Sequence, residues 1–301
     1  MESLSLVVRP NYSLASFTSW NVGGPADNFC TPVALEELVE AYHWAHTHNL
    51  PVTVLGGGTN VLISDEGIEG FVIGLSKFGG TQVRENDGRL HISAFAGTPK
   101  SEILKIFLKY KLAPALFLAG LPGDVGGGVV MNAGVAEDFR PREFNEIVDW
   151  IEVIRPNEKI RRIQKDELKW AYRHSEGWQP GIIVRVHMSW PLESQEDILE
   201  KVKAANKLRL QKQPLELPSC GSVFRNPPGH KAGQLIEACG LKGYKIGGAQ
   251  VSPKHANFIV NVGEAKARDI HRVIEHVKAT VKKEKGVDLQ TEVVYLGRWS
   301  E

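Results

Sequence analysis

The chain has 301 residues, a length that suggests about two domains. Hydrophobic residues make up 42% of the sequence and charged residues 24%, as in ordinary globular proteins. The 36 Lys and Arg residues almost balance the 35 Asp and Glu residues, which leaves a net charge of +1. This balance excludes a globally basic surface, so we expect neither nucleic acid nor an acidic membrane as a partner.

The cysteine content is typical of a reducing compartment. Only Cys30, Cys220 and Cys239 are present, and none belongs to a C-x-x-C pair, which argues against a disulfide framework or a structural zinc site. The N-terminal segment lacks the positive charge and the apolar length of a signal peptide. The longest apolar run, residues 113–122, has about half the length of a membrane span. We therefore expect a cytoplasmic protein without membrane insertion.

Apolar periodicity predicts a mixture of helices and strands. The predicted helices cover residues 34–49, 98–110, 195–212, 232–239 and 264–285. The predicted strands cover residues 52–55, 61–64, 71–75, 90–95, 148–154, 182–188, 257–262 and 291–297. Gly240 and Gly286 end two of the helices as C-terminal caps. This order indicates an α+β fold, with a break near residues 190–195.

Three histidines, His43, His46 and His48, lie on the first predicted helix. Only His43 and His46 share a face of that helix, and no cysteine or carboxylate partner stands at ligand spacing. We therefore expect no bound metal.

Two glycine-rich segments are the first features that point to a ligand. One follows a strand and reads GGGTN (56–60), and the other is GLPGDVGGGVVMNAG (120–134). Bare backbone allows a ligand to approach closely, and successive N–H groups form a concavity that binds anions. A plain tight turn also explains the first segment, whose pattern fits neither a P-loop nor a Rossmann fingerprint. Two such segments together favour a dinucleotide held between two subdomains.

A series of motifs in chain order makes a family resemblance specific. The motifs are FTSWNVGGPADNF (17–29), VLGGGTNVLISDEGIEG (54–70), GLPGDVGGGVVMNAG (120–134), AYRHS (171–175), PSCGSVFRNPPGHKAGQLIEACGLKGYKIGGAQVSPKHANFIVN (218–261) and TEVVYLG (291–297). With them the chain resembles the UDP-N-acetylenolpyruvoylglucosamine reductase (MurB) family of peptidoglycan biosynthesis. The short spacing after AYRHS is similar to the family's short, type II subtype.

The resemblance implies a fold with a two-part FAD-binding region of the vanillyl-alcohol-oxidase/PCMH type and an α/β substrate domain. Residues 1–75 and 76–190, with 289–301 returning to the second part, would hold FAD noncovalently. Residues 191–288 would bind the UDP-sugar. NADPH would be the reductant, UDP-N-acetylglucosamine enolpyruvate the acceptor and UDP-N-acetylmuramate the product. The resemblance also implies a monomer.

Three residues match the family's catalytic positions. In the implied reaction a hydride passes from reduced FAD N5 to C3 of the enolpyruvyl group, and negative charge develops at C2 and in the carboxylate. Ser222 would give the proton to C2, Arg173 would bind the carboxylate, and Glu292 would help to stabilise the enol form. Without the resemblance, these side chains read as a turn hydroxyl, a solvated loop arginine and a strand-entry carboxylate.

The resemblance also assigns contact residues. The FAD contacts would be Leu55, Gly56, Gly57, Gly58, Thr59, Asn60, Gly120, Gly123, Gly126, Gly127, Asn132 and Ala133. Lys212 and Asn226 would contact the UDP diphosphate. For Lys212, a helix-end lysine favoured by the helix dipole is the other reading.

The chain departs from the family pattern at two places. Asp124 stands where a small neutral residue is usual, and a carboxylate there is unfavourable beside a phosphate unless it caps a helix or points to solvent. Residues 135–138 lack the family's usual aromatic side chain. Two rival functions remain at this point: an oxidase of the same fold, and a nucleotide-sugar-binding module without flavin.

Overall fold

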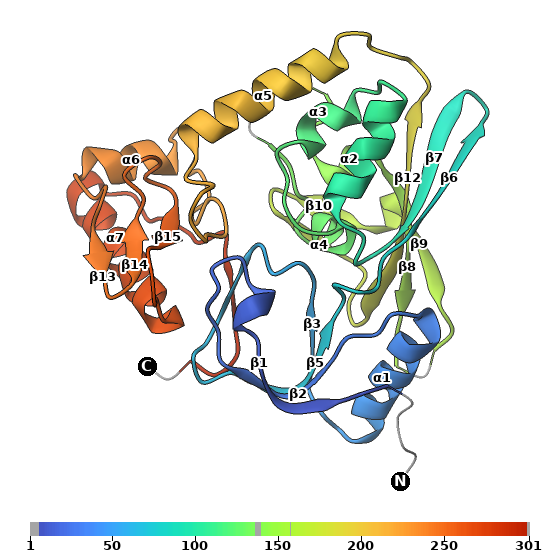
Figure 1. The fold of residues 1–301 in the computed structure, drawn as a ribbon, viewed down its shortest axis with the longest axis horizontal. Coiled ribbons are helices and arrows are strands. Elements are labelled where there is room, and N and C mark those ends of the chain that lie inside the picture. Colours follow the sequence, from blue (N-terminus) through green and yellow to red (C-terminus); the bar gives the residue numbers. More distant parts are fainter. Residues whose placement is uncertain (1–5, 136–139, 157, 300–301) are drawn as a thin grey trace. The chain divides into compact units, whose positions relative to one another are not determined.

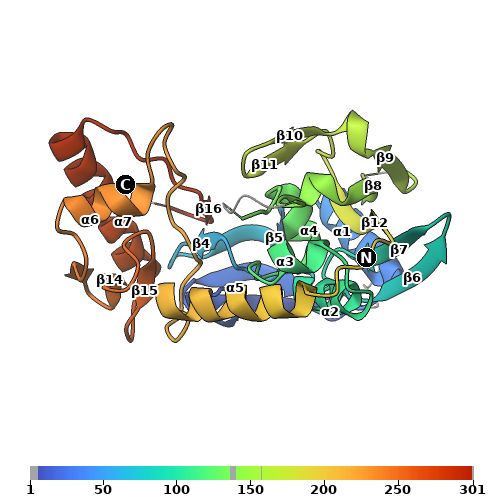
Figure 2. The same cartoon turned by 90° about the horizontal axis from the view of Figure 1, so that it is seen from above.

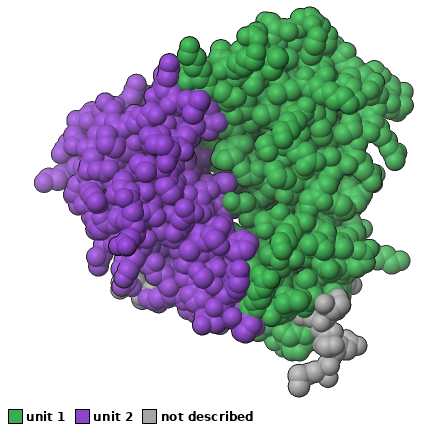
Figure 3. Space-filling view, in the orientation of Figure 1, with its two compact units in different colours: residues 1–9, 29–57, 71–208 green, residues 10–28, 58–70, 209–301 purple. Residues whose placement is uncertain are grey.

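The structure is a computed structural model that describes residues 6–135, 140–156 and 158–299. The chain divides into two compact units, which Figure 3 colours separately. Unit 1 comprises residues 1–9, 29–57 and 71–208, and unit 2 comprises residues 10–28, 58–70 and 209–301. The predicted three-part division of the chain stays a prediction. Of the sequence departures described above, residues 136–138 lie outside the described ranges.

Unit 1 is built on a five-stranded antiparallel sheet of order β6-β7-β12-β8-β9 (Figure 1). Its strands are β6 (Thr81–Asn86), β7 (Arg89–Phe95), β12 (Ile182–Pro191), β8 (Val148–Ile154) and β9 (Arg161–Gln164). Apolar and polar residues alternate along β7, and Leu90, Ile92 and Ala94 are buried. One face of the sheet therefore belongs to the core, and the other carries partly exposed side chains.

Short helices supply most of the remaining core of unit 1. They are α1 (Leu35–Thr47), α2 (Lys100–Lys109), α3 (Pro114–Leu118) and α4 (Val125–Val130). The buried side chains of α2 are Lys100, Ile103 and Phe107, so one face of this helix packs inward. Helix α4 contacts β7 and β12. A separate hairpin of β10 (Lys169–Ala171) and β11 (His174–Glu176) completes this part of the chain (Figure 2).

A second sheet has the order β1-β2-β5-β3, and the division into units falls within its strands β1 (Arg9–Ser13), β2 (Pro25–Cys30) and β5 (Ile68–Gly74). Strand β3 (Val52–Leu55) runs parallel to the second half of β5 and leads directly into the first glycine-rich segment. The division also falls within helix α5 (Ile198–Lys212).

Unit 2 surrounds its own apolar core. Strand β4 (Val61–Ile63) runs parallel to β16 (Val294–Leu296). A separate antiparallel sheet contains β13 (Lys245–Ile246), β14 (Ala249–Val251) and β15 (Ile259–Asn261). The helices of this unit are α6 (Ala232–Ala238) and α7 (Ala267–Lys285). Trp20 is fully buried there, and its indole N–H donates to the carbonyl oxygen of Ile259 at 2.7 Å. This bond ties the first motif of the chain to a strand 239 residues later.

Several predicted elements are confirmed with close bounds. The strand predicted at residues 148–154 is β8, and the helix predicted from residue 264 is α7, which ends at a left-handed Gly286. The glycine-rich segment at residues 120–134 differs from the expected loop, because residues 125–130 form helix α4. The described part of the chain contains no helix both long and apolar enough to span a membrane.

Candidate active site

The first glycine-rich segment presents a backbone donor in unit 1. Leu55, buried at the end of β3, leads into Gly56 and Gly57. The Gly57 N–H donates to the carboxylate of Asp124. A Cβ atom at Gly56 would overlap the same carboxylate, so a larger residue here would have to displace Asp124 from its hydrogen bonds.

The second glycine-rich segment meets the first at Asp124. This residue is the N-cap of α4, and its Oδ1 accepts the Gly127 N–H at 2.6 Å. Its side chain is 6% exposed, and Oδ2 accepts the Gly57 N–H. The carboxylate therefore caps a helix, one of the two conditions under which a charge at this position is favourable. The two segments therefore meet at one buried carboxylate, which accepts one backbone N–H group from each.

Other glycines of the second segment are explained by packing. A Cβ at Gly126 would lie 2.9 Å from the Cβ of Ala96, and a Cβ at Gly128 would overlap the ring of Phe144. Gly123 has a φ of +86°, which side chains rarely tolerate. Close contact of α4 with the sheet requires bare backbone here, whether or not a ligand is bound.

Asn132 is a structural node in unit 1. Its side chain is buried, with Nδ2 donating to Glu143 Oε2 and to the Ala171 carbonyl oxygen, each at 3.1 Å. Its Oδ1 accepts the N–H of Asn145 at 3.1 Å. These hydrogen bonds within the protein occupy the side-chain amide, so a cofactor contact predicted at Asn132 would come from its backbone.

Arg173 is held in place rather than solvated. It lies at the tip of the β10–β11 hairpin with a φ of +57°, and its side chain is 10% exposed. Nη2 donates to the carbonyl oxygen of Gly134 at 2.8 Å, and Nη1 lies 3.8 Å from Glu143 Oε1. The guanidinium carbon lies 4.6 Å from the centre of the Tyr172 ring. A fixed, planar cation of this kind suits the recognition of a carboxylate.

In unit 2, the end of the first glycine-rich segment is hydrogen-bonded to Glu292 and to Val294, the first residue of β16. Gly58 has a φ of +61°, and its carbonyl oxygen accepts the Ser19 N–H at 3.0 Å. The Asn60 side-chain amide donates to the carbonyl oxygen of Glu292 at 3.0 Å. The Asn60 carbonyl oxygen accepts the Val294 N–H at 3.0 Å.

The segments of Ser222 and Glu292 lie side by side in unit 2. The Glu292 N–H donates to the Val223 carbonyl oxygen at 2.8 Å, and Phe224 forms a β-bridge with Thr291. Ser222 and Glu292 are both partly exposed. The structure thus brings together two of the three predicted catalytic residues, which are 70 positions apart in the sequence.

Asn257 clamps the segment that follows Ser222. Its carbonyl oxygen accepts the Val223 N–H at 2.8 Å, and its Oδ1 accepts the Phe224 N–H at 3.0 Å. Its Nδ2 donates to the Phe224 carbonyl oxygen at 2.9 Å. Asn257 is 4% exposed, so the clamp is protected from water and holds the backbone directly after Ser222.

The negative charge of Glu292 affects the pKa of the Cys220 thiol. Burial, and then the negative charge of Glu292, raise the pKa of Cys220 well above its usual value. Cys220 is 6% exposed and uncrosslinked, which makes it an apolar filler rather than a nucleophile.

The two predicted diphosphate contacts occupy different settings. Asn226 Oδ1 accepts the N–H of Ala232 at 3.0 Å, so the amide NH2 is the part of Asn226 that could donate to a ligand. Lys212 is exposed and is the last residue of α5. Sequence reasoning missed Arg225, whose Nε is buried without a hydrogen-bond partner in the described part of the chain. The signal available for it was a basic residue between Ser222 and Asn226.

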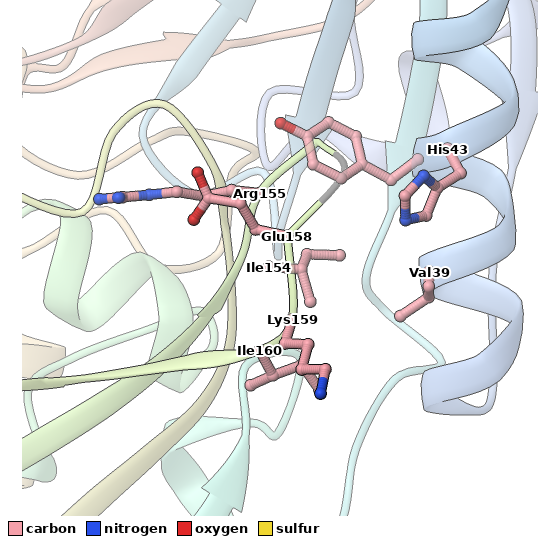
Figure 4. Close-up of a pocket in the computed structure, with 8 residues that line it drawn as sticks. Val39, His43, Ile154, Arg155, Glu158, Lys159 and Ile160 are labelled. Carbon is pink, nitrogen blue, oxygen red and sulfur yellow. The ribbon is translucent and has the colours of Figure 1, made fainter.

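A cavity of about 450 Å³ lies elsewhere in unit 1 (Figure 4). It is lined by Val39, Tyr42 and His43 of α1 and by residues 154–155 and 158–160. None of the predicted site residues lines it.

Replacing Asp124 with alanine is expected to lower the free energy of unfolding by about 2 kcal/mol. The variant loses a helix N-cap and leaves the amides of Gly57 and Gly127 without their acceptor. Asp124→Asn, which keeps a side-chain oxygen as acceptor, should lose less. The urea midpoint of the two variants and the parent measures this order, and equal midpoints would contradict it.

Lys100 is expected to make stability depend on pH. Burial lowers its pKa from 10.5 to about 8, while the charge of Asp124 partly opposes this shift. Between these values the unfolded chain binds more protons than the folded chain, so the free energy of unfolding rises with pH in this window. The folded protein is most stable with respect to Lys100 above the unfolded-state pKa of 10.5, where the amine is neutral in both states. This stability is lost as the pH falls through the folded-state pKa of about 8.

The rise in the free energy of unfolding that Lys100 causes between pH 8 and pH 10.5 is at most about 3 kcal/mol. Urea titrations from pH 7 to pH 10.5 should give a smaller rise for Lys100→Met than for the parent, whereas Lys109→Met, on an exposed position of the same helix, should follow the parent. Parallel curves for all three proteins would exclude a buried Lys100 ammonium as the cause.

Comparison with known proteins places these features in a family. The model of the UDP-N-acetylenolpyruvoylglucosamine reductase C-terminal domain matches residues 213–296, and the FAD binding domain model matches residues 26–164. A reductase of this name from Caldanaerobacter subterraneus is 38% identical over 95% of this chain and 93% of its own length. One from Limosilactobacillus fermentum is 39% identical over 97% of this chain and 95% of its own length.

A solved structure extends the likeness to three dimensions. The crystal structure of UDP-N-acetylenolpyruvylglucosamine reductase from Thermus caldophilus superposes with a TM-score of 0.77 at 31% identity, over 98% of this chain and all of that chain. These matches confirm the predicted fold class, α+β with an FAD-binding region of the vanillyl-alcohol-oxidase/PCMH type.

Proposed function

Because the chain belongs to the UDP-N-acetylenolpyruvoylglucosamine reductase family, we propose that it reduces UDP-N-acetylglucosamine enolpyruvate to UDP-N-acetylmuramate with NADPH as electron donor. The observation that carries the proposal is identity of about two residues in five to reductases of this name over almost the whole length of both chains. The chain is an FAD-binding oxidoreductase of peptidoglycan precursor synthesis by the same matches.

The residues that match the family's FAD contacts lie in the two glycine-rich segments or, for Leu55, directly before the first. Asp124 already accepts the N–H groups of Gly57 and Gly127, so the other backbone amides of the two segments are the groups that would donate to a diphosphate. We propose the matched glycines of residues 56–60 and 120–127, with Leu55, Thr59, Asn60, Asn132 and Ala133, as the residues that hold FAD. Bound FAD would carry the hydride from NADPH to C3 of the enolpyruvyl group.

We propose that Arg173 binds the substrate carboxylate. Negative charge spreads into this carboxylate when C3 receives the hydride, and a cation that is already fixed in position stabilises it without reorganising. The hydrogen bond to Gly134 and the nearby Glu143 support this role because they hold the guanidinium in one orientation.

We propose that Ser222 donates the proton to C2 and that Glu292 stabilises the enol form. A serine hydroxyl is a weak acid at neutral pH, so its action depends on an exact position beside groups that stabilise the alkoxide. The pairing of the two segments and the Asn257 clamp supply that rigidity. Lys212 and Asn226 stay our candidates for the diphosphate, and Arg225, whose Nε is buried, adds a cation to the same segment.

An anaerobic absorbance trace at the flavin band tests the proposal. NADPH is added to the purified protein first, and UDP-N-acetylglucosamine enolpyruvate second. Bleaching followed by recovery on adding the substrate is the expected result. Recovery only when air is admitted would replace the proposal with an oxidase of the same fold. A protein that binds the UDP-sugar but no FAD would identify a binding module.

We also propose that the enzyme acts in the cytoplasm as a monomer without nucleic-acid or membrane partners. Three uncrosslinked cysteines and the near-neutral net charge support this proposal. Sedimentation of the FAD-loaded protein measures the oligomeric state, and a dimer would contradict the proposal.

A further inference from the structure

Two histidines and one aspartate of unit 1 meet on the five-stranded sheet. His91 lies on β7, Asp149 on β8 and His187 on β12, which are neighbouring strands (Figure 1). Each residue offers one ligand atom, and these atoms all lie within 4.8 Å of one another. All three side chains are partly buried, on the face of the sheet opposite the buried Leu90 and Ile92.

A β-bulge brings Asp149 to this face. His187 pairs with Trp150, but the next residue, Met188, pairs with Val148, so the register shifts and Asp149 is the extra residue on β8. A bulge re-aims the side chain that it contains, and without it Asp149 and Trp150 would point to opposite faces. Bulges of this kind occur often at functional positions.

Contacts around the cluster hold two of the three side chains. His187 Nδ1 lies 3.0 Å from Asp149 Oδ2, and the Ser189 hydroxyl donates to Asp149 Oδ1 at 3.1 Å. The His187 ring stacks on Trp150 with 4.6 Å between ring centres and 9° between planes. Partners that orient a ligand are typical of metal sites.

We propose that His91, Asp149 and His187 form a binding site for Zn²⁺. Two imidazoles and one carboxylate are a common protein ligand set for zinc, with water in the fourth position. Zinc ligands lie about 2.1 Å from the ion, so a tetrahedral pair is about 3.4 Å apart. The His187–Asp149 distance is already close to this value. Since no two ligand atoms are more than 4.8 Å apart, closing the widest separation requires at most about 1.4 Å of movement, which rotation of a partly exposed ring supplies.

The charges around the cluster set the strength of the site. The carboxylate of Asp149 offsets part of the ion's charge, while the guanidinium of Arg89 donates to Ser189 Oγ at 2.9 Å and adds a cation nearby. This cation argues for a weaker site than one with two carboxylates. A bound ion would cross-link three neighbouring strands, with β12 in the centre, and would stabilise unit 1.

Zinc titration of the tag-free, FAD-loaded, chelator-treated protein tests the site. Calorimetry is expected to show one equivalent of Zn²⁺ bound, and thermal unfolding is expected to shift to higher temperature with zinc. His91→Gln and Asp149→Asn should each weaken zinc binding about tenfold or more and remove the thermal shift. His46→Gln, at an exposed position of α1, should bind zinc like the parent.

A spectroscopic measurement keeps the test independent of the variants' folding. Co²⁺ in place of zinc should give visible bands at longer wavelength than the flavin, with the intensity of a four-coordinate site. Absence of saturable zinc binding by the parent would overturn the proposal. Zinc binding that His91→Gln and Asp149→Asn leave unchanged, in variants with parent-like circular dichroism, would also overturn it.

Discussion

Replacing Ser222 with alanine is expected to leave flavin reduction by NADPH nearly unchanged and to slow flavin reoxidation by the UDP-sugar about 10²–10⁴-fold, the usual contribution of a positioned general acid. The reason is that only the second half-reaction transfers a proton to C2. The segment of Ser222 is fixed by the Asn257 clamp and by pairing with the Glu292 segment, so the substitution removes a hydroxyl without removing a backbone bond. Anaerobic stopped-flow absorbance at the flavin band measures the two half-reactions separately.

The control for this experiment is Ser219→Ala, three residues earlier in the same segment, which should behave like the parent in both half-reactions. Ser222→Cys, which keeps a proton on the side chain, should recover part of the lost rate. An equal slowing of both half-reactions in Ser222→Ala would refute the proton-donor role and point instead to disturbed flavin or substrate binding.

Replacing Gly58 with alanine is expected to destabilise unit 2 by about 3 kcal/mol or more and to weaken FAD binding. The φ of +61° costs an alanine about 1–2 kcal/mol. The added Cβ would also overlap the carbonyl oxygen of Phe17, and a backbone atom cannot move aside as a flexible side chain can. Displacement of this loop would disturb Asn60 and its hydrogen bond to the Glu292 carbonyl oxygen.

Gly88→Ala is the matched control for Gly58→Ala. Gly88 has a φ of +70°, but no heavy atom lies within 4 Å of a Cβ added there. The variant should therefore show only the conformational cost, about 1–2 kcal/mol, and should keep FAD. Urea unfolding and the flavin-to-protein absorbance ratio measure both effects. Similar losses in the two variants would mean that the contact with Phe17 relaxes at little cost.

The spacing of apolar residues correctly predicted those helices and strands that bury a single apolar face. Helix α7 is the clearest case, because Ile270, Val273, Ile274 and Val277 recur at helical spacing and are all fully buried. The glycine that ends this helix was equally visible in the sequence. The short helix α4 was not, because three consecutive glycines favour no helix. Its formation depends on the Asp124 cap and on close packing against Ala96 and Phe144.

In the candidate site, too, the sequence indicated some features and the structure alone showed others. The motif order pointed to Ser222, Arg173 and Glu292, whose roles stay a prediction, and the structure pairs the segments of Ser222 and Glu292. The setting of Arg173 could not be foreseen, because its partner Glu143 lies 30 positions away in a segment without any motif. The buried Nε of Arg225 was hidden for a similar reason, since burial depends on what packs around the side chain.

The sequence by itself determined the family, the fold class and the order of the main elements, because periodicity, caps and motif spacing are properties of neighbouring residues. Only the tertiary structure decided which distant groups meet. Asp124 binds the Gly57 amide 67 positions away, and a register shift in β8 turns Asp149 towards His187. Such encounters depend on strand register and on the packing of whole elements, and no local pattern encodes either.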